Sequence, residues 1–229
     1  MKNIEILRED DLSIIVNKPA GLPVQGGKGV KSSLDKILAE YCSLRVSGTV
    51  PLLVHRLDKE TSGVLLAAKG HEAAARFSGC FSASYGKNPP AEKKAVKLYT
   101  AVCVASAEPA AQKQNEGIIT DELMIHGVLK ESKTYYRVIK TCPLPEINLE
   151  CSVLELELGT GRMHQIRRHL AMNGNPILGD DKYGDFQLNK KLRRLTGLKR
   201  LLLHASRLII KEFEIDVTAP LPEYFKKYI

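Results

Sequence analysis

The segment best suited to carry chemistry is the string HRLDKETSG at His55–Gly63, which contains Asp58. It lies between two short hydrophobic runs, Pro51–Val54 and Val64–Ala68, which have the length and composition of strands. A loop held at both ends by strands presents a carboxylate in a fixed orientation, as an attacking or proton-accepting group requires. An isolated aspartate in a turn more often accepts hydrogen bonds from turn amides, so this string by itself leaves both interpretations open.

Tyr99 and Arg167 are the next candidates, and each belongs to a longer string. Tyr99 lies in Lys97–Ala101 (KLYTA), within an expected strand, where a half-buried tyrosine is common. Arg167 ends Gly161–Arg167 (GRMHQIR), within an expected helix, where most arginines are solvated charges. Two shorter strings, NKPAG at Asn17–Gly21 and LHA at Leu203–Ala205, complete the set.

In this order the five strings resemble the motifs of the RluA-type pseudouridine synthases, which isomerise uridine to pseudouridine in ribosomal or transfer RNA. HRLDKETSG is similar to the family pattern H-R-L-D-x-x-T-S-G, which carries the aspartate essential for the reaction. The strings span residues 17 to 205, nearly the whole chain. The layout is most similar to the ribosomal large-subunit type. The resemblance therefore implies a cytoplasmic RNA pseudouridine synthase, an isomerase.

The resemblance also implies roles for individual residues. Asp58 is the essential carboxylate, and whether it attacks the sugar, attacks the base or removes a proton stays open. A closed pocket disfavours an ionised carboxylate, and the resemblance places Arg167 beside Asp58, where a bidentate pair would favour and orient it. Tyr99 lies against the uracil, and Arg56 fills the space left by the extruded uridine. Further substrate contacts are expected at Lys18, Arg162, His164, Gln165 and His204.

The implied reaction needs no cofactor, because it breaks the N-glycosidic bond, rotates the uracil and rejoins it through C5 without a redox change. The sequence agrees, since five cysteines without a C-x-x-C pair are typical of a reducing cytoplasm rather than of a zinc ribbon. His164 and His169 are five residues apart, not the three or four of two ligands on one helix face. Asp180 and Asp181 are expected to cap a turn. We therefore expect no metal.

The charge of +8 over 229 residues favours a polyanionic partner, here structured RNA. Tryptophan is absent and aromatic residues make up 6%, which argues against a broad base-stacking surface. The densest basic run is Lys190–Arg194 with Lys199 and Arg200, which by default is a solvated face and, given the resemblance, an RNA-docking region. No apolar run approaches the length of a membrane helix, about 18–20 residues, and no signal-peptide stretch is evident.

Short strands outnumber helices without a regular alternation, which predicts an α+β fold. We expect one catalytic domain over residues 1–229, a monomer, with a mixed, mainly antiparallel sheet bent around a central RNA-binding cleft and Asp58 at its bottom. The expected strands are Ile4–Arg8, Leu12–Asn17, Pro51–Val54, Val64–Ala68, Lys97–Ala105, Thr134–Thr141, Cys151–Leu158 and the hairpin Leu201–Ile210 with Phe213–Val217. The expected helices are Leu34–Tyr41, His71–Tyr85, His164–Met172, with Met163, Ile166 and Leu170 buried, and Leu221–Tyr228.

Three departures from the family pattern stand out. Met163 replaces the usual threonine or serine, Ser78–Val96 is longer and looser, and we expect no S4-type RNA-binding domain before the catalytic strings. One alternative function is a non-catalytic RNA-binding or ribosome-assembly protein of the same fold, although Asp58, Tyr99 and Arg167 are all present. Another is a metal-dependent nuclease that uses Asp58 with Asp180 or Asp181.

Overall fold

The computed structural model describes residues 4–27, 29–45, 50–85, 93–105, 115–125 and 128–229. The chain divides into two compact units, which are described separately. The first unit comprises Met1–Lys97 and Ala205–Pro220, and the second comprises Leu98–His204 and Leu221–Ile229. Two of the three boundaries fall inside strands, one in β5 (Val96–Val104) and one in β9 (Leu203–Ile210), and the third follows Pro220.

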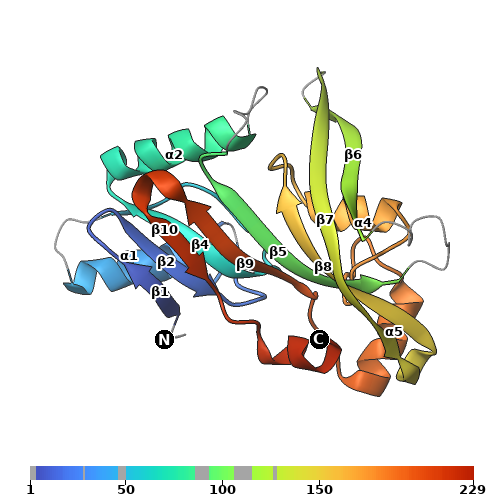
Figure 1. Cartoon of the computed structure of the whole chain (residues 1–229). Helices are drawn as coiled ribbons and strands as arrows, with labels where there is room; N and C mark the ends of the chain where they lie inside the picture. Colours follow the sequence, from blue (N-terminus) through green and yellow to red (C-terminus); the bar gives the residue numbers. More distant parts are fainter. Residues whose placement is uncertain (1–3, 28, 46–49, 86–92, 106–114, 126–127) are drawn as a thin grey trace. The chain divides into compact units, whose positions relative to one another are not determined.

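The first unit is built on a sheet with the strand order β1-β2-β4-β9, with β3 beside β4 and β10 beside β9 (Figure 1). The pairs β1–β2, β2–β4, β3–β4 and β9–β10 are antiparallel. The central strands β2 and β4 are buried along almost their whole length, so they read as continuous apolar runs. The bounds of these strands are β1 Glu5–Glu9, β2 Ser13–Lys18, β3 Pro51–Leu53, β4 Ser62–Lys69 and β10 Ile215–Thr218.

Helix α2 (His71–Tyr85) supplies the aromatic part of the first unit's core. Phe77 and Phe81 pack in one cluster with Leu66 of β4 and Leu208 of β9. The helix repeats its apolar residues at four-residue spacing, which directs both rings to the same face. Helix α1 (Leu34–Arg45) buries Leu34, Leu38 and Cys42 by the same spacing, and η2 (Lys211–Phe213) joins β9 to β10.

The second unit contains the antiparallel strand order β5-β8-β7-β6, with helices α4 and α5 (Figure 1). Strand β8 alternates buried leucines with glutamates, as its sequence predicts. The bounds are β6 Glu116–Ile125, β7 Val128–Leu144, β8 Leu149–Leu158, α4 Gln165–Met172, α5 Phe186–Thr196, η1 Pro145–Ile147 and η3 Glu223–Tyr228.

The α+β prediction is confirmed, and so are helix α2 and the β9–β10 hairpin. The prediction of a buried Met163 is wrong, because its side chain is 67% exposed, whereas Ile166 and Leu170 are buried. Strand β6 and helix α5 were not predicted, and the C-terminal helix is a 3₁₀ helix. The central part of the longer and looser segment expected over Ser78–Val96, residues 86–92, lies outside the described residues, and the single-domain expectation remains a prediction.

No helix in the described part of the chain is long and apolar enough to cross a membrane.

Candidate active site

The Asp58 loop connects β3 to β4, and the His55 side chain fixes its start. The β3–β4 ladder ends with Leu53 opposite Ala67, and one residue further along β4 the amide of Leu66 donates to His55 Nε2 at 3.0 Å. Burial, with a smaller effect of the Lys97 charge, holds the pKa of His55 well below 6.5. The imidazole is therefore neutral, as an accepting Nε2 requires, and it replaces a backbone acceptor where the ladder stops.

The end of the loop is fixed by Gly63. Its φ is +114°, a region that L-residues rarely adopt, and an added Cβ would lie 2.1 Å from the carbonyl oxygen of Ala205 on β9. Only glycine permits this approach of the two backbones. Between the two anchors, Thr61 N donates to Asp58 O at 3.1 Å and closes a turn. Asp58 is half-buried and Arg56 is exposed.

Lys18 is fully buried, and its ammonium group joins the NKPAG segment to the Asp58 loop. Nζ donates to the carbonyl oxygens of Pro19 at 3.0 Å, Leu22 at 2.9 Å and Lys59 at 3.1 Å. The Lys59 carbonyl also accepts from the amide of Gly21 at 2.8 Å. The residue directly after Asp58 is thus held by two donors from the NKPAG segment. The family resemblance implies a substrate contact at Lys18, whereas in the structure its ammonium group donates to carbonyl groups of the first unit.

The charge of Lys18 also acts on Asp58. Burial lowers the pKa of Lys18 to about 7, and the charges of Glu60 and Asp58 act in the opposite direction. The attraction between the charges of Lys18 and Asp58 is mutual. Three carbonyl acceptors match the three protons of an ammonium group. The first unit therefore holds a cation close to the carboxylate that the reaction would need.

In the second unit, Arg167 on α4 forms a buried bidentate ion pair with Asp180. Its Nε and Nη2 donate to the two carboxylate oxygens, each at 2.8 Å. Asp180 also accepts from the amides of Lys182 and Tyr183, as expected of a residue that caps a turn. Burial alone would raise the pKa of Asp180, but these hydrogen bonds and the Arg167 charge outweigh it and lower the pKa.

The contacts of Asp180 and Asp181 are relevant to the alternative function, a metal-dependent nuclease. Its carboxylate is occupied by Arg167 and two backbone amides, while Asp181 pairs with Arg193 at 3.2 Å on the surface. Among the described residues, no group of three or more His, Cys, Asp or Glu is arranged to hold a metal ion. The expected pairing of Arg167 with Asp58 remains a prediction.

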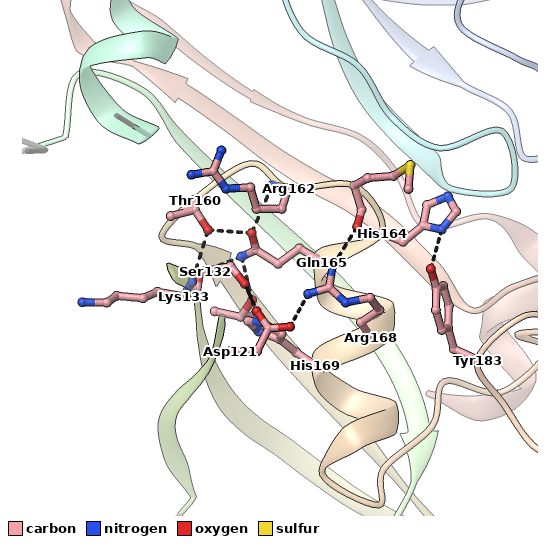
Figure 2. Close-up of polar contacts among 12 residues, drawn as sticks. Asp121, Ser132, Lys133, Thr160, Arg162, His164, Gln165, Arg168, His169 and Tyr183 are labelled. Carbon is pink, nitrogen blue, oxygen red and sulfur yellow. Dashed lines mark hydrogen bonds and ion pairs between the residues drawn. The ribbon is translucent and has the colours of Figure 1, made fainter. Parts of the chain in front are cut away.

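Gln165 connects the start of α4 to β7 and to the preceding loop (Figure 2). Its Oε1 accepts from Thr160 Oγ1 at 2.6 Å and from the amide of Arg162 at 3.1 Å. Its Nε2 donates to Lys133 O at 2.7 Å and Thr134 Oγ1 at 3.0 Å. All of the amide group is thus used within the unit, which gives Gln165 a positioning role for the helix that carries Arg167.

Three other predicted contacts differ in their exposure. His164 is half-buried, adopts a left-handed conformation (φ 51°) as the N-cap of α4, and shares a 3.0 Å hydrogen bond with Tyr183 Oη (Figure 2). Arg162 is half-buried, and its Nε is buried with no hydrogen-bond partner in the part of the chain that the structure describes. His204 is fully buried with its ring 6.0 Å from that of Phe225. Tyr99 is also buried, opposite Leu156 on β8.

A buried polar network that sequence reasoning missed ties α4 to the β6–β7 hairpin (Figure 2). His169 Nε2 lies 3.0 Å from both Ser132 Oγ and Asp121 Oδ1, and Asp121 also accepts from Ser132 and Arg168. Burial raises the pKa of Asp121, but these partners outweigh it and lower the pKa. The network is not a hydrolase triad, because serine and aspartate contact the same ring nitrogen and His169 Nδ1 has no hydrogen-bond partner among the described residues.

A cavity of about 380 Å³ lies in the second unit among β5–β8 and the end of α4. Its polar lining includes Asn115, Asn173 and Asn175. None of the residues predicted for the site lines it, so it is not the candidate active site.

Comparison with known proteins gives a consistent result. Residues 12–172 match the family described as RNA pseudouridylate synthase. Ribosomal large subunit pseudouridine synthase C of Rickettsia felis is 36% identical over 96% of this chain and 68% of the relative, and the Vibrio vulnificus protein of the same name is 31% identical over 98% and 68%. The solved structure of human RNA pseudouridylate synthase domain containing 4 has a TM-score of 0.74 at 26% identity, covering 97% of this chain and 90% of the human one.

Proposed function

The chain belongs to the RNA pseudouridylate synthase family, and on that premise we propose that it isomerises uridine to pseudouridine in large-subunit ribosomal RNA. Two relatives at 36% and 35% identity carry a name that specifies this RNA. The +8 charge suits such a polyanionic substrate. The reaction is an isomerisation within one nucleotide.

Asp58 is the catalytic carboxylate in this proposal. The observation that carries it is the rigid presentation of the loop, with His55 at one end, Gly63 at the other and Lys18 tied to the carbonyl of Lys59. A group that must meet a sugar or base carbon needs its approach set in advance, since a displacement of about 1 Å costs about 10²-fold in rate. A loop that served only to connect two strands would not need three separate anchors.

Tyr99, Arg167 and Arg56 complete the proposal. Tyr99 contacts the target uracil, and Arg167 supplies a guanidinium whose orientation is fixed by Asp180. Arg56 is exposed two residues before Asp58, which suits a side chain that fills the gap left by an extruded uridine. Lys18, Gln165 and His204 act as positioning residues, because their side chains are buried within their own units.

The test is tritium release from RNA labelled at uridine C5, under single-turnover conditions. We expect turnover by the wild type and none by Asp58→Asn, because an amide is neither a nucleophile nor a base. Asp11→Asn makes the same change at an exposed position and should behave as the wild type. Undiminished turnover by Asp58→Asn would refute the assignment of Asp58.

The same assay separates the alternatives. A wild type that binds ribosomal RNA but releases no tritium would be a binding protein of this fold. Cleaved RNA that disappears when EDTA is added would identify a metal-dependent nuclease, whereas the isomerase is expected to remain active in EDTA.

A further inference from the structure

Helix α5 and the turn after it carry an unusual concentration of positive charge. From Phe186 to Arg200 the sequence contains six basic residues and no acidic one, whereas the whole chain has a net charge of +8. All six side chains are exposed. They are Lys190, Lys191, Arg193, Arg194, Lys199 and Arg200.

The helix sorts these charges onto its solvent side. Leu192 and Asn189 face the interior, whereas Lys190 and Arg194 are four residues apart and follow Phe186 along one exposed row. Lys191 lies beside this row, three residues from Arg194. Phe186 is 66% exposed, so the row combines cations with an accessible aromatic ring.

The basic face is held rigidly. Asp185 caps the helix by accepting from the amides of Gln187 and Leu188, and Gly197 ends it in a left-handed conformation. Asn189 accepts from Gly179 N at 3.0 Å and donates to Asp180 O at 2.9 Å. The helix is therefore fixed directly to the residue that binds Arg167.

Stability of the isolated protein does not account for this pattern. Basic residues in the last turn favour a helix, which explains Arg193 and Arg194 but not Lys190 and Lys191 in its middle. Like charges three and four residues apart repel each other, as Lys190 and Arg194 do here. A polyanion laid along the face would relieve this repulsion and release counterions.

We propose that Lys190, Lys191 and Arg194 form a docking surface for the phosphate backbone of the substrate RNA, outside the residues that act on the uridine. This inference rests on the proposed function in one respect, that the polyanion is the RNA carrying the target. The surface would set how strongly the RNA is held and would leave the chemical step unchanged.

The test replaces the three residues together by glutamine (K190Q, K191Q and R194Q) in the full chain. A matched control makes the same change in net charge at three other exposed lysines, K31Q, K36Q and K140Q. RNA binding is measured from about 50 to 200 mM salt, and single-turnover rates are measured at saturating and at limiting enzyme. Circular dichroism checks the folding of both triple variants.

Loss of three phosphate contacts should lower the slope of log affinity against log salt by about 2 to 3 units and weaken binding about tenfold or more. The rate at saturating enzyme should stay within about twofold of wild type, and the control triple should lose less than about threefold in affinity. If the triple variant misfolds, single K191Q and K190Q variants should each lower the slope by about 0.7 to 0.9 units.

Equal weakening by both triples would overturn the proposal, because net charge rather than this face would then support binding. Unchanged binding and salt slope in the α5 triple would overturn it as well. These binding results decide the docking surface even if the wild type forms no pseudouridine, a result that would count against the proposed function alone.

Discussion

Replacing Lys18 by methionine separates the two effects that the structure assigns to this buried cation. The substitution keeps the unbranched chain and removes the ammonium group. The carbonyl of Lys59 keeps the Gly21 amide as a donor, whereas the carbonyls of Pro19 and Leu22 lose the hydrogen bond from Lys18 Nζ. Leu22 is buried and Pro19 is exposed, so only the loss at Leu22 leaves a buried acceptor without this donor, at a cost of about 1–3 kcal/mol.

The pH dependence follows from the lowered pKa of Lys18. With a pKa of about 7 when folded and 10.5 ordinarily, the unfolded chain binds more protons between these values, so the free energy of unfolding of the wild type rises with pH across this window. The rise is at most about 1.4 kcal/mol per pH unit, or about 3–4 kcal/mol from pH 7 to pH 10. The methionine variant lacks this rise of the free energy of unfolding with pH. The difference in stability between the two proteins should thus change by about 3–4 kcal/mol from pH 7 to pH 10, in favour of the wild type at the higher pH.

The loss of activity in K18M should not parallel its change in stability. At pH 7 the variant remains folded but lacks both the tether to Lys59 O and the cation near Asp58, so pseudouridine formation should fall about tenfold or more. Urea unfolding at several pH values and single-turnover assays at pH 7 measure the two quantities. Lys59→Met is the control, since its side chain is exposed, and it should change stability by less than about 0.5 kcal/mol. A stability difference between wild type and K18M that does not change from pH 7 to 10, or a fully active K18M, would refute the reasoning.

Two further substitutions test the framework of the site. Gly63→Ala should destabilise the protein by about 3 kcal/mol or more in urea unfolding, because its Cβ would meet the Ala205 carbonyl at 2.1 Å, and a loss below about 1 kcal/mol would contradict the close approach. Asp180→Asn should cost about 3–5 kcal/mol at pH 7 by leaving Arg167 without its anion. Because the pKa of Asp180 is lowered by folding, this difference should shrink as pH falls below about 4, and a pH-independent difference would refute the ion pair.

Local sequence signals predicted the elements whose pattern is strong. Helix α2 has a continuous apolar spacing with no breaker, and the strand–loop–strand arrangement around Asp58 follows from two short apolar runs. Helix α5 was not predicted, although Asp185 is a typical N-cap residue and Gly197 a typical residue at a helix end. The basic run between them indicated a charged patch and not the exposed face of a helix. Strand β6 carries acidic residues that weaken its strand pattern, and one of them, Asp121, has its partner at His169.

Contacts between distant residues were not predictable in the same way. Nothing in the string GRMHQIR indicates that Arg167 binds a carboxylate 13 residues later, or that Gln165 binds the backbone of Lys133. The string mixes buried side chains, such as these two, with the exposed Met163, and a motif match alone cannot separate positioning residues from substrate contacts. Hydrogen bonds that use a whole side-chain group, as for Gln165, identify a positioning residue.

The hydrogen-bond partners of Lys18 and Arg167 differ, and with them the role that each cation can have toward Asp58. A guanidinium already paired with Asp180 forms a neutral pair, whose field at another anion is weaker than that of a single charge. Lys18 is surrounded by carbonyl groups, which carry no net charge, and its charge acts on Asp58 within the same unit. Lys18 is therefore the cation that the first unit itself holds near Asp58, whereas Arg167 offers a guanidinium whose orientation Asp180 fixes.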